Sequence, residues 1–232
     1  MMKEKSRSIR IMFGGIAGNY DLMNRLITFG QDQVWRRWVV RMANPPLGGR
    51  LLDAGTGTGR IGQEVLKSYP TTRVTGSDFS LEMMQAGKRR HAGEGMFWCA
   101  GDALCLPFKD ESFDVVTSGY LIRNVEDAEM AFSEQVRVLK PGGRVVCLDT
   151  SPPPNTPLRP FIVFFLTHII PLLGQIISRN RSAYTYLPES TQTFYPPNAL
   201  ATVMQRAGLA NIFHRSFMLG TIAIHVGTKP ET

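Results

Sequence analysis

The chain has 232 residues, 43% of them hydrophobic, which is enough for a core without disulfide or metal staples. The formal net charge is +7, with basic residues in excess before residue 42 and after residue 149. No recognisable nucleic-acid module is present, so the basic ends indicate either solubility or contact with an anionic membrane surface. The first residues lack the apolar core of an export signal, and we expect a cytoplasmic protein.

The three cysteines, Cys99, Cys105 and Cys147, occur in apolar surroundings without C-x-x-C or Cys/His spacing. This pattern argues for free thiols in a reducing compartment and against a zinc site. We expect no structural metal.

Residues 1–46 are predicted to form a helical cap. Residues 16–24 suit a short irregular or helical segment after a basic, mobile start. Apolar residues at helical spacing predict an amphipathic helix over 33–43, and the prolines and glycines of 44–49 end it. The apolar stripe of this helix is more typical of a core than of membrane contact.

The next stretch is the most informative one: an apolar strand ends at Asp53 and is followed by Gly55, Gly57 and Gly59. Such glycines allow a sharp turn and a close approach to a ligand, and a helix over about 61–69 would direct its N-terminal amides there. Residues 57–62 also match the dinucleotide pattern G-x-G-x-x-G. We expect Asp53 to face the ligand, where it would repel a pyrophosphate and favour an ammonium or sulfonium group. A dinucleotide site and a turn without ligand remain the alternatives.

Two more strand ends carry acids. Asp78 follows a strand at 73–78 and lies 19 residues after Gly59, the usual distance for a carboxylate that accepts from ribose hydroxyls. After a third strand at 96–99, Asp102 is expected to accept from an adenine amino group while Ala103 lies along the ring; the alternative is a surface turn. A fourth strand, ending near residue 117, leads towards the same pocket through residues 119–124.

A helix at 127–139 and a strand at 144–149 complete residues 47–150 as a cofactor-binding core. Residues 151–195 interrupt the alternation as an apolar lid insertion. We weighed a membrane span over 161–177 and prefer two short helices capping an apolar pocket, because residues 171–174 break the run. Residues 196–232 predict a closing helix at 197–207 and a hairpin of 210–217 with 220–226. The fold class is therefore α/β, with a doubly wound, mostly parallel seven-stranded sheet in a single domain.

These motifs, in this order, resemble the S-adenosylmethionine-dependent class I methyltransferases, whose motifs match residues 53–59, Asp78, 101–103 and 140–143. Within that superfamily the chain resembles the C-methyltransferases of ubiquinone and menaquinone biosynthesis over nearly its whole length. The stretches that carry this closer resemblance are 20–24 (YDLMN), 29–31 (FGQ), 35–37 (WRR), 106–108 (LPF), 123–125 (RNV), 137–144 (RVLKPGGR) and 186–190 (YLPES).

The resemblance implies S-adenosylmethionine as the cofactor and C-methylation of a reduced demethylquinone, with demethylmenaquinol favoured. Carried over by position, the family's cofactor contacts fall on Thr58, Asp78, Asp102 and Ala103, and a serine usual at the end of the fourth strand aligns with Gly119, next to Ser118. The predicted cofactor site also includes Asp53, Gly55, Gly57, Gly59 and Phe79. The resemblance assigns catalysis to Arg123 and Asn124, and substrate binding to Tyr20, Asn24, Arg123, Tyr184 and Tyr186. A polyprenyl quinol as partner implies contact with the inner membrane surface without a span; homodimerisation stays open.

Arg123 cannot act as a base at neutral pH, so we expect it to stabilise a phenolate or to order a water that accepts the proton. Asn124 would hold the geometry of its partner. A structural ion pair of Arg123 with Asp21 or Glu126 is the alternative role.

The chain departs from the family at residues 120–122, which are Tyr-Leu-Ile where Phe-Gly-Leu is common, and at 150–153, which are Thr-Ser-Pro-Pro in place of a Phe-Ser-Lys-Pro-like run. Arg60 also stands where the family often has an acid. These departures bear on which quinone is bound more than on the chemistry. Two other functions remain: methylation of a soluble phenol or polyketide, and a non-catalytic, cofactor-binding role in a quinone-synthesis complex.

Overall fold

The computed structural model describes residues 4–90, 95–178 and 181–231, and one seven-stranded sheet runs through them in the order β3-β2-β1-β4-β5-β7-β6. The strands are β1 (Arg50–Ala54), β2 (Arg73–Asp78), β3 (Phe97–Ala100), β4 (Phe113–Gly119), β5 (Leu139–Thr150), β6 (Ala210–Phe217) and β7 (Ile222–Thr228). β7 alone runs in the direction opposite to the other strands of the sheet. The predicted doubly wound, mostly parallel sheet is confirmed, and so is the closing hairpin.

Helices cover both faces of the sheet because successive strand residues alternate between them. Leu51 and Val146 pack with α3 (Asp32–Ala43) and α4 (Arg60–Ser68) on one face. Leu52 and Val145 pack with α6 (Ala128–Val138) and α10 (Pro197–Arg206) on the other. α5 (Leu81–Arg90) follows β2. The sheet is thus buried on both sides, as the near-continuous apolar strands predict.

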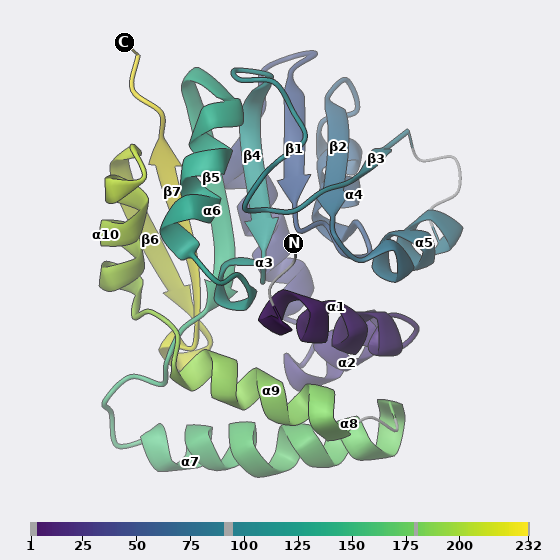
Figure 1. The fold of residues 1–232 in the computed structure, drawn as a ribbon. Helices are drawn as coiled ribbons and strands as arrows, with labels where there is room; N and C mark the ends of the chain where they lie inside the picture. Colours follow the sequence, from purple (N-terminus) through teal and green to yellow (C-terminus); the bar gives the residue numbers. More distant parts are fainter. Residues whose placement is uncertain (1–3, 91–94, 179–180, 232) are drawn as a thin grey trace.

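The remaining helices gather beyond the carboxyl ends of the parallel strands. In Figure 1 the arrowheads of β1 and β4 point down towards α1 (Glu4–Ile16), α2 (Tyr20–Ile27), α8 (Ile170–Ser178) and α9 (Arg181–Gln192). Residues 4–16, predicted as a mobile start, form a helix that contacts α5 and α9. The N-terminal cap and the lid insertion therefore lie at the same edge of the sheet.

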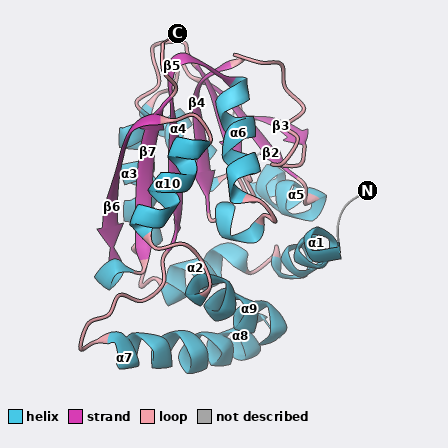
Figure 2. Cartoon of the chain, turned by 60° about the vertical axis from the view of Figure 1, so that its left-hand side comes forward, coloured by secondary structure: helices cyan, strands magenta, loops and turns pink. Residues whose placement is uncertain are grey.

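The lid insertion differs from the prediction. α7 (Arg159–Phe164) leads through a π-helical turn at Phe165–Ile169 directly into α8, so the predicted break at residues 171–174 does not occur. A proline inside a helix lacks the amide hydrogen for its intrahelical bond, and a π turn just before Pro171 absorbs that mismatch. The result is one long helical run along the bottom of the molecule (Figure 2).

By length and composition, Arg159–Ile177 is the one candidate membrane span in the described part of the chain. Only 17% of it is buried inside the protein. The same composition suits a helix that lies on a membrane surface, so length alone does not decide between the two arrangements.

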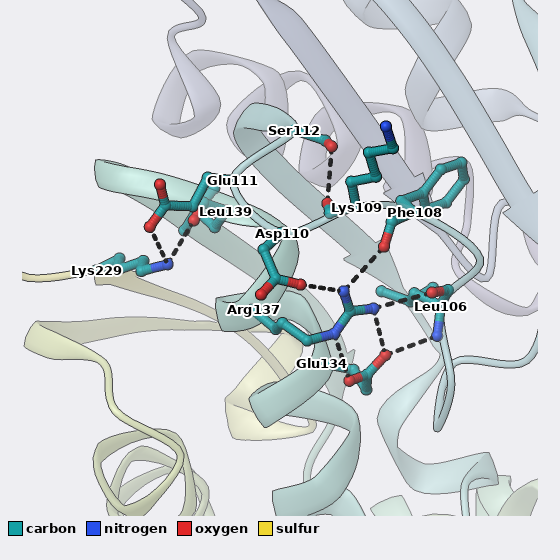
Figure 3. A network of polar contacts seen from close by, with 10 residues as sticks. All are labelled: Leu106, Phe108, Lys109, Asp110, Glu111, Ser112, Glu134, Arg137, Leu139 and Lys229. Atoms are coloured by element: carbon teal, nitrogen blue, oxygen red, sulfur yellow. Dashed lines mark hydrogen bonds and ion pairs between the residues drawn. The ribbon is translucent and has the colours of Figure 1, made fainter.

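Arg137 ties the loop before β4 to α6 (Figure 3). Its guanidinium donates to the carbonyl oxygens of Leu106 and Phe108, both at 2.9 Å, and pairs with Asp110 at 2.6 Å and Glu134 at 2.8 Å. This loop enters β4 from its amino end, away from the lid. Arg137, the first residue of the 137–144 stretch, thus stabilises the loop that leads into β4.

Candidate functional site

The glycine loop between β1 and α4 has the geometry that its glycines predict. Gly55, Gly57 and Gly59 have φ angles of +64°, +55° and +79°, a region that side chains with a Cβ rarely adopt. Asp53 accepts from the hydroxyls of Thr56 at 2.7 Å and Thr117 at 3.0 Å. Burial raises the pKa of Asp53 to about 6. The carboxylate that was expected to face a ligand thus braces the loop with both oxygens.

Asp78 joins the end of β2 to the same loop. One carboxylate oxygen accepts from the Gly57 amide at 2.7 Å and the other from the Ser80 amide at 2.8 Å. Burial raises the pKa of Asp78 to about 6, although these amide bonds oppose the shift. A carboxylate oxygen has more than one lone pair, so Asp78 can still accept from ribose hydroxyls.

Two adjoining pockets form one cleft at the ends of β1, β2 and β4. They share Tyr20, Gly55, Gly57, Gly119 and Tyr120, and hold about 400 and 420 Å³ of empty space. The first adds Asp78, Phe79 and Met83 to this lining, and the second adds Asp53, Thr58 and Ile61. We call this space the cofactor cleft. A buried carboxylate, apolar side chains and a glycine backbone that a ligand can approach closely fit a nucleoside that carries an amino-acid tail.

Some predicted cofactor residues lie outside this lining. Asp102 is exposed, and its carboxylate accepts from the Leu104 amide at 2.9 Å. Asp102 and Ala103 come shortly after the last residue of β3, which pairs with Asp78. A Cβ on Gly59 would lie 2.5 Å from the Trp98 ring, so packing also requires a glycine there. Ser118 is fully buried, one residue before Gly119.

The N-terminal cap is fastened over the cofactor cleft by Asp21 of α2. Its oxygens accept from the Thr58 hydroxyl at 2.8 Å and from Arg60 Nε at 3.0 Å, and also pair with Arg90. Arg90 further donates to the Gly18 carbonyl at 2.6 Å. We call this set the Asp21 latch. Sequence reasoning missed it, because three segments far apart in the chain supply its members.

Arg123 follows β4 on the short turn Ile122–Asn124. Its Nη1 lies 2.5 Å from Asp149 Oδ1 at the end of β5, and both side chains are buried. Burial works to lower the pKa of Arg123, but Asp149 and nearby tyrosines outweigh it and raise this pKa. Arg123 thus forms a buried ion pair, which was the alternative role, but its partner is Asp149 and not Asp21 or Glu126 as suggested. Arg123 Nε is buried without a hydrogen-bond partner among the described residues.

Tyr120 separates the cofactor cleft from a second pocket. Its φ angle of +58° is uncommon for an aromatic residue, and its amide is held by the Leu148 carbonyl at 2.7 Å. The Arg123 guanidinium lies 5.0 Å above its ring centre. Strain of this kind persists only where the surroundings enforce it. The sequence marked Tyr120 only as a departure from the family's phenylalanine.

The other predicted substrate residues divide into two groups. Asn124 donates to the Tyr120 carbonyl at 2.7 Å and accepts from the Tyr186 hydroxyl at 3.1 Å. Tyr20 and Asn24 line the cofactor cleft, and burial raises the pKa of Tyr20. Tyr184 instead packs against Gly174 between α9 and α8, outside the lining of either pocket.

A mostly apolar pocket lies between the strand ends and the lid helices, with about 530 Å³ of empty space. We call it the lid pocket; its lining is Asn24, Ile27, Thr28, Tyr120, Arg123, Thr150, Phe165, Leu166, Ile170, Leu187, Thr191, Met218, Thr221 and Ile222. It shares Tyr120 and Asn24 with the cofactor cleft. Two ligands bound in these spaces would therefore meet beside Tyr120 and Arg123.

Cys99, Cys105 and Cys147 are free thiols, as predicted. In the described ranges no three His, Cys, Asp or Glu side chains gather closely enough to hold a metal ion.

A model described as the ubiE/COQ5 methyltransferase family matches residues 1–229. The "Ubiquinone/menaquinone biosynthesis C-methyltransferase UbiE" of Desulfotalea psychrophila is 49% identical over 97% of this chain and 92% of its own length. The "Demethylmenaquinone methyltransferase" of Roseiflexus castenholzii is 43% identical over 97% and 95%. A solved S-adenosylmethionine-dependent methyltransferase from Thermotoga maritima, described as a possible histamine N-methyltransferase, is 22% identical, with a TM-score of 0.65 over 94% and 98% of the two chains. That likeness shows the expected class I methyltransferase fold.

Proposed function

Since the chain belongs to the ubiE/COQ5 methyltransferase family, we propose that it methylates a ring carbon of a reduced demethylquinone, with S-adenosylmethionine as donor. Demethylmenaquinol is the favoured acceptor, because relatives such as that of Roseiflexus castenholzii carry this name. One observation supports the proposal most directly: a buried arginine stands where the cofactor cleft and an apolar pocket meet.

The cofactor cleft fits S-adenosylmethionine. When bound, this cofactor supplies an electrophilic methyl group on a positively charged sulfur. Asp78 would accept from the ribose hydroxyls, and Phe79 offers an apolar surface beside it. Gly55 and Gly57 let the backbone approach the ligand, while Asp53 acts by bracing their loop. Asp102 and Ala103 would bind the adenine from the neighbouring strand end.

The acceptor ring would occupy the lid pocket. A ring carbon ortho to a hydroxyl becomes electron-rich once that hydroxyl loses or shares its proton. Arg123 would stabilise the phenolate oxygen, and its unpartnered Nε is a donor available for this purpose. Asp149 holds the guanidinium in place. Asn124, joined to Tyr186, would support the turn that carries the arginine.

The proton must leave through another acceptor, because an arginine in an ion pair keeps its own protons. A water held by the Arg123 guanidinium would serve, since it lies next to the oxygen that gives up the proton. Arg123 thereby orients the water and stabilises the charge without being the base.

A polyprenyl tail belongs in a bilayer, so the protein would work as a cytoplasmic enzyme bound peripherally to the membrane. The outer side of α7–α8 exposes Phe161, Phe164, Leu172 and Ile176 at a spacing of three, eight and four residues, which is one helix face. Phe29 of the cap, 76% exposed, stacks on Phe165 of the lid run. This apolar face, together with the basic ends of the chain, suits an interfacial helix.

Mass spectrometry of the quinones in cells that lack the protein tests the function. We expect the mature quinone to disappear and a precursor lighter by one methyl group to accumulate. An unchanged quinone pool would refute the proposal. Methylation of soluble phenols without lipid or detergent would favour the soluble-phenol function instead, and cofactor binding without turnover of any demethylquinol would favour a non-catalytic role.

A further inference from the structure

Two threonine hydroxyls meet in the lid pocket, one from the sheet and one from the lid. Thr150 is the last residue of β5, and Thr191 lies near the end of α9. Their Oγ1 atoms are 3.2 Å apart, and the residues are 8% and 2% exposed. Both line the lid pocket. We call them the threonine pair.

The threonine pair has one proton more than it uses. Each hydroxyl supplies one O–H donor, and the pair shares a single hydrogen bond. Across the described residues neither hydroxyl has a second partner. A donor held in a largely apolar space costs free energy until an acceptor reaches it.

The other two threonines of the lid pocket differ from the pair. Thr28 donates to the Asn24 carbonyl at 2.7 Å, and Thr221 donates to the Met218 carbonyl at 2.8 Å. Their protons are already used by the protein itself. The threonine pair is therefore distinguished among the pocket's threonine hydroxyls by an unused proton.

We propose that the threonine pair donates a hydrogen bond to one oxygen of the aromatic acceptor while Arg123 binds the other. The inference rests on the proposed function, in which the ring of a quinol occupies the lid pocket. A quinol has two oxygens across its ring, and the unused donors of the lid pocket include Arg123 Nε and the threonine pair, with Asn24 Nδ2 as a third. Binding at both ends fixes which ring carbon faces the cofactor cleft. The pair is thus a specificity element for a dihydroxy ring.

The test compares two reduced acceptors with the same prenyl tail: a 1,4-naphthalenediol and the matching naphthol that lacks the second hydroxyl. Thr150→Val and Thr191→Val remove one hydroxyl each and keep the side-chain shape. For the diol we expect Thr150→Val to raise KM about tenfold, because it removes the hydroxyl whose proton is unused. Thr191→Val leaves that proton in place and removes only the bond that orients Thr150, so it should raise KM less, and the double variant should resemble Thr150→Val. For the naphthol the wild type and both variants should share one KM.

Thr221→Val is the matched control, because its hydroxyl lines the same pocket but already donates to Met218. Any effect of this control should be equal for the two acceptors. Variants that weaken both acceptors equally, or neither, would overturn the inference. If the valine variants do not fold, the wild type alone tests the inference, because equal KM values for the diol and the naphthol would also contradict it. Inactivity of the wild type on every demethylquinol would instead refute the proposed function.

Discussion

The Arg123–Asp149 pair is a buried ion pair, and such pairs contribute little net stability after desolvation is counted. Arg123 nevertheless lines the lid pocket, and its Nε is buried without a hydrogen-bond partner among the described residues. A structural role alone would not require an unpartnered donor in a residue of this pocket. The geometry therefore favours a role in binding the acceptor oxygen.

Arg123→Ala should lower turnover by about 100-fold or more, the usual effect of removing a donor that stabilises an oxyanion. The affinity for S-adenosylhomocysteine, measured by calorimetry, should remain nearly unchanged, because Arg123 lines the lid pocket and not the cofactor cleft. Arg137→Ala is the control, since its ion pairs lie at the opposite end of β4. Loss of cofactor binding in the Arg123 variant would contradict the assignment of Arg123 to the binding of the acceptor.

Cofactor affinity should rise with pH through about 6. Burial raises the pKa of Asp78 from 3.8 to about 6, and an ionised carboxylate is the better acceptor for ribose hydroxyls. Affinity for S-adenosylhomocysteine should therefore fall about tenfold from pH 7 to pH 5. The stability of the protein without cofactor should depend on pH in the opposite direction. Because the folded protein binds the Asp78 proton more tightly than the unfolded chain does, the contribution of Asp78 to stability declines from about pH 4 to pH 6. Calorimetry that gives a flat affinity from pH 5 to 8 would contradict the assignment.

Single residues show where sequence reasoning stopped. The sequence separation between the glycine loop and Asp78 indicated that the two lie in one site, and they do, because parallel strands end at one edge of the sheet. The role of Asp53 was not predictable, since Thr117 comes from a distant strand and takes up its second oxygen. Neither the partner of Arg123 nor the strained backbone of Tyr120 has a local signature, because tertiary contacts impose both.

At the scale of elements, α2 forms part of the wall of the cofactor cleft. Asp21, Thr58, Arg60 and Arg90 connect it to the glycine loop and to α4 and α5. Tyr20 of the same helix lines the cofactor cleft. We therefore predict that weakening the Asp21 latch speeds exchange of the cofactor.

Asp21→Asn should accelerate the release of S-adenosylhomocysteine about tenfold, because bonds to a charged acceptor are each stronger than neutral ones. Stopped-flow fluorescence would follow the release. The control is Asp110→Asn, which weakens an arginine pair of similar length far from the cleft. Equal release rates in the wild type and the Asp21 variant would show that the latch does not limit exchange.

The α7–α8 run should bind membranes through its exposed face. Phe161→Ser together with Phe164→Ser should lower co-sedimentation with anionic vesicles at least about tenfold, given about 1.5–3 kcal/mol per fully buried aromatic side chain. Phe213→Ser, an exposed phenylalanine on β6, serves as the matched control. Binding that is insensitive to salt and to the loss of these phenylalanines would contradict membrane docking.

Periodicity predicted the strands and most helices to within a few residues, because each must bury one face or both. It failed at the lid. The proline and glycine of residues 171–174 are typical breakers, but a π turn and packing of Gly174 against Tyr184 keep the helix continuous. A proline rule considers the residue alone and cannot foresee such an accommodation.

For the whole molecule, the doubly wound sheet explains why distant segments form one site. The ends of β1, β2, β4 and β5 supply the cofactor cleft and the Arg123–Asp149 pair, and the cap and lid close over them (Figure 1). We propose that cap, core, lid and closing hairpin act as a single methyltransferase domain. The alternation of strands and helices predicts that the site lies at this edge of the sheet. The position of the lid over the site depends on packing that no local sequence pattern encodes.

The most direct test is methyl transfer by the purified protein. It would be incubated with isotope-labelled S-adenosylmethionine and chemically reduced demethylmenaquinone in mixed micelles, and the products analysed by mass spectrometry and NMR. We predict one labelled methyl group on a ring carbon, formed by the wild type and almost absent with Arg123→Ala. Label on an oxygen, or none on any reduced demethylquinone while S-adenosylmethionine still binds, would contradict the account.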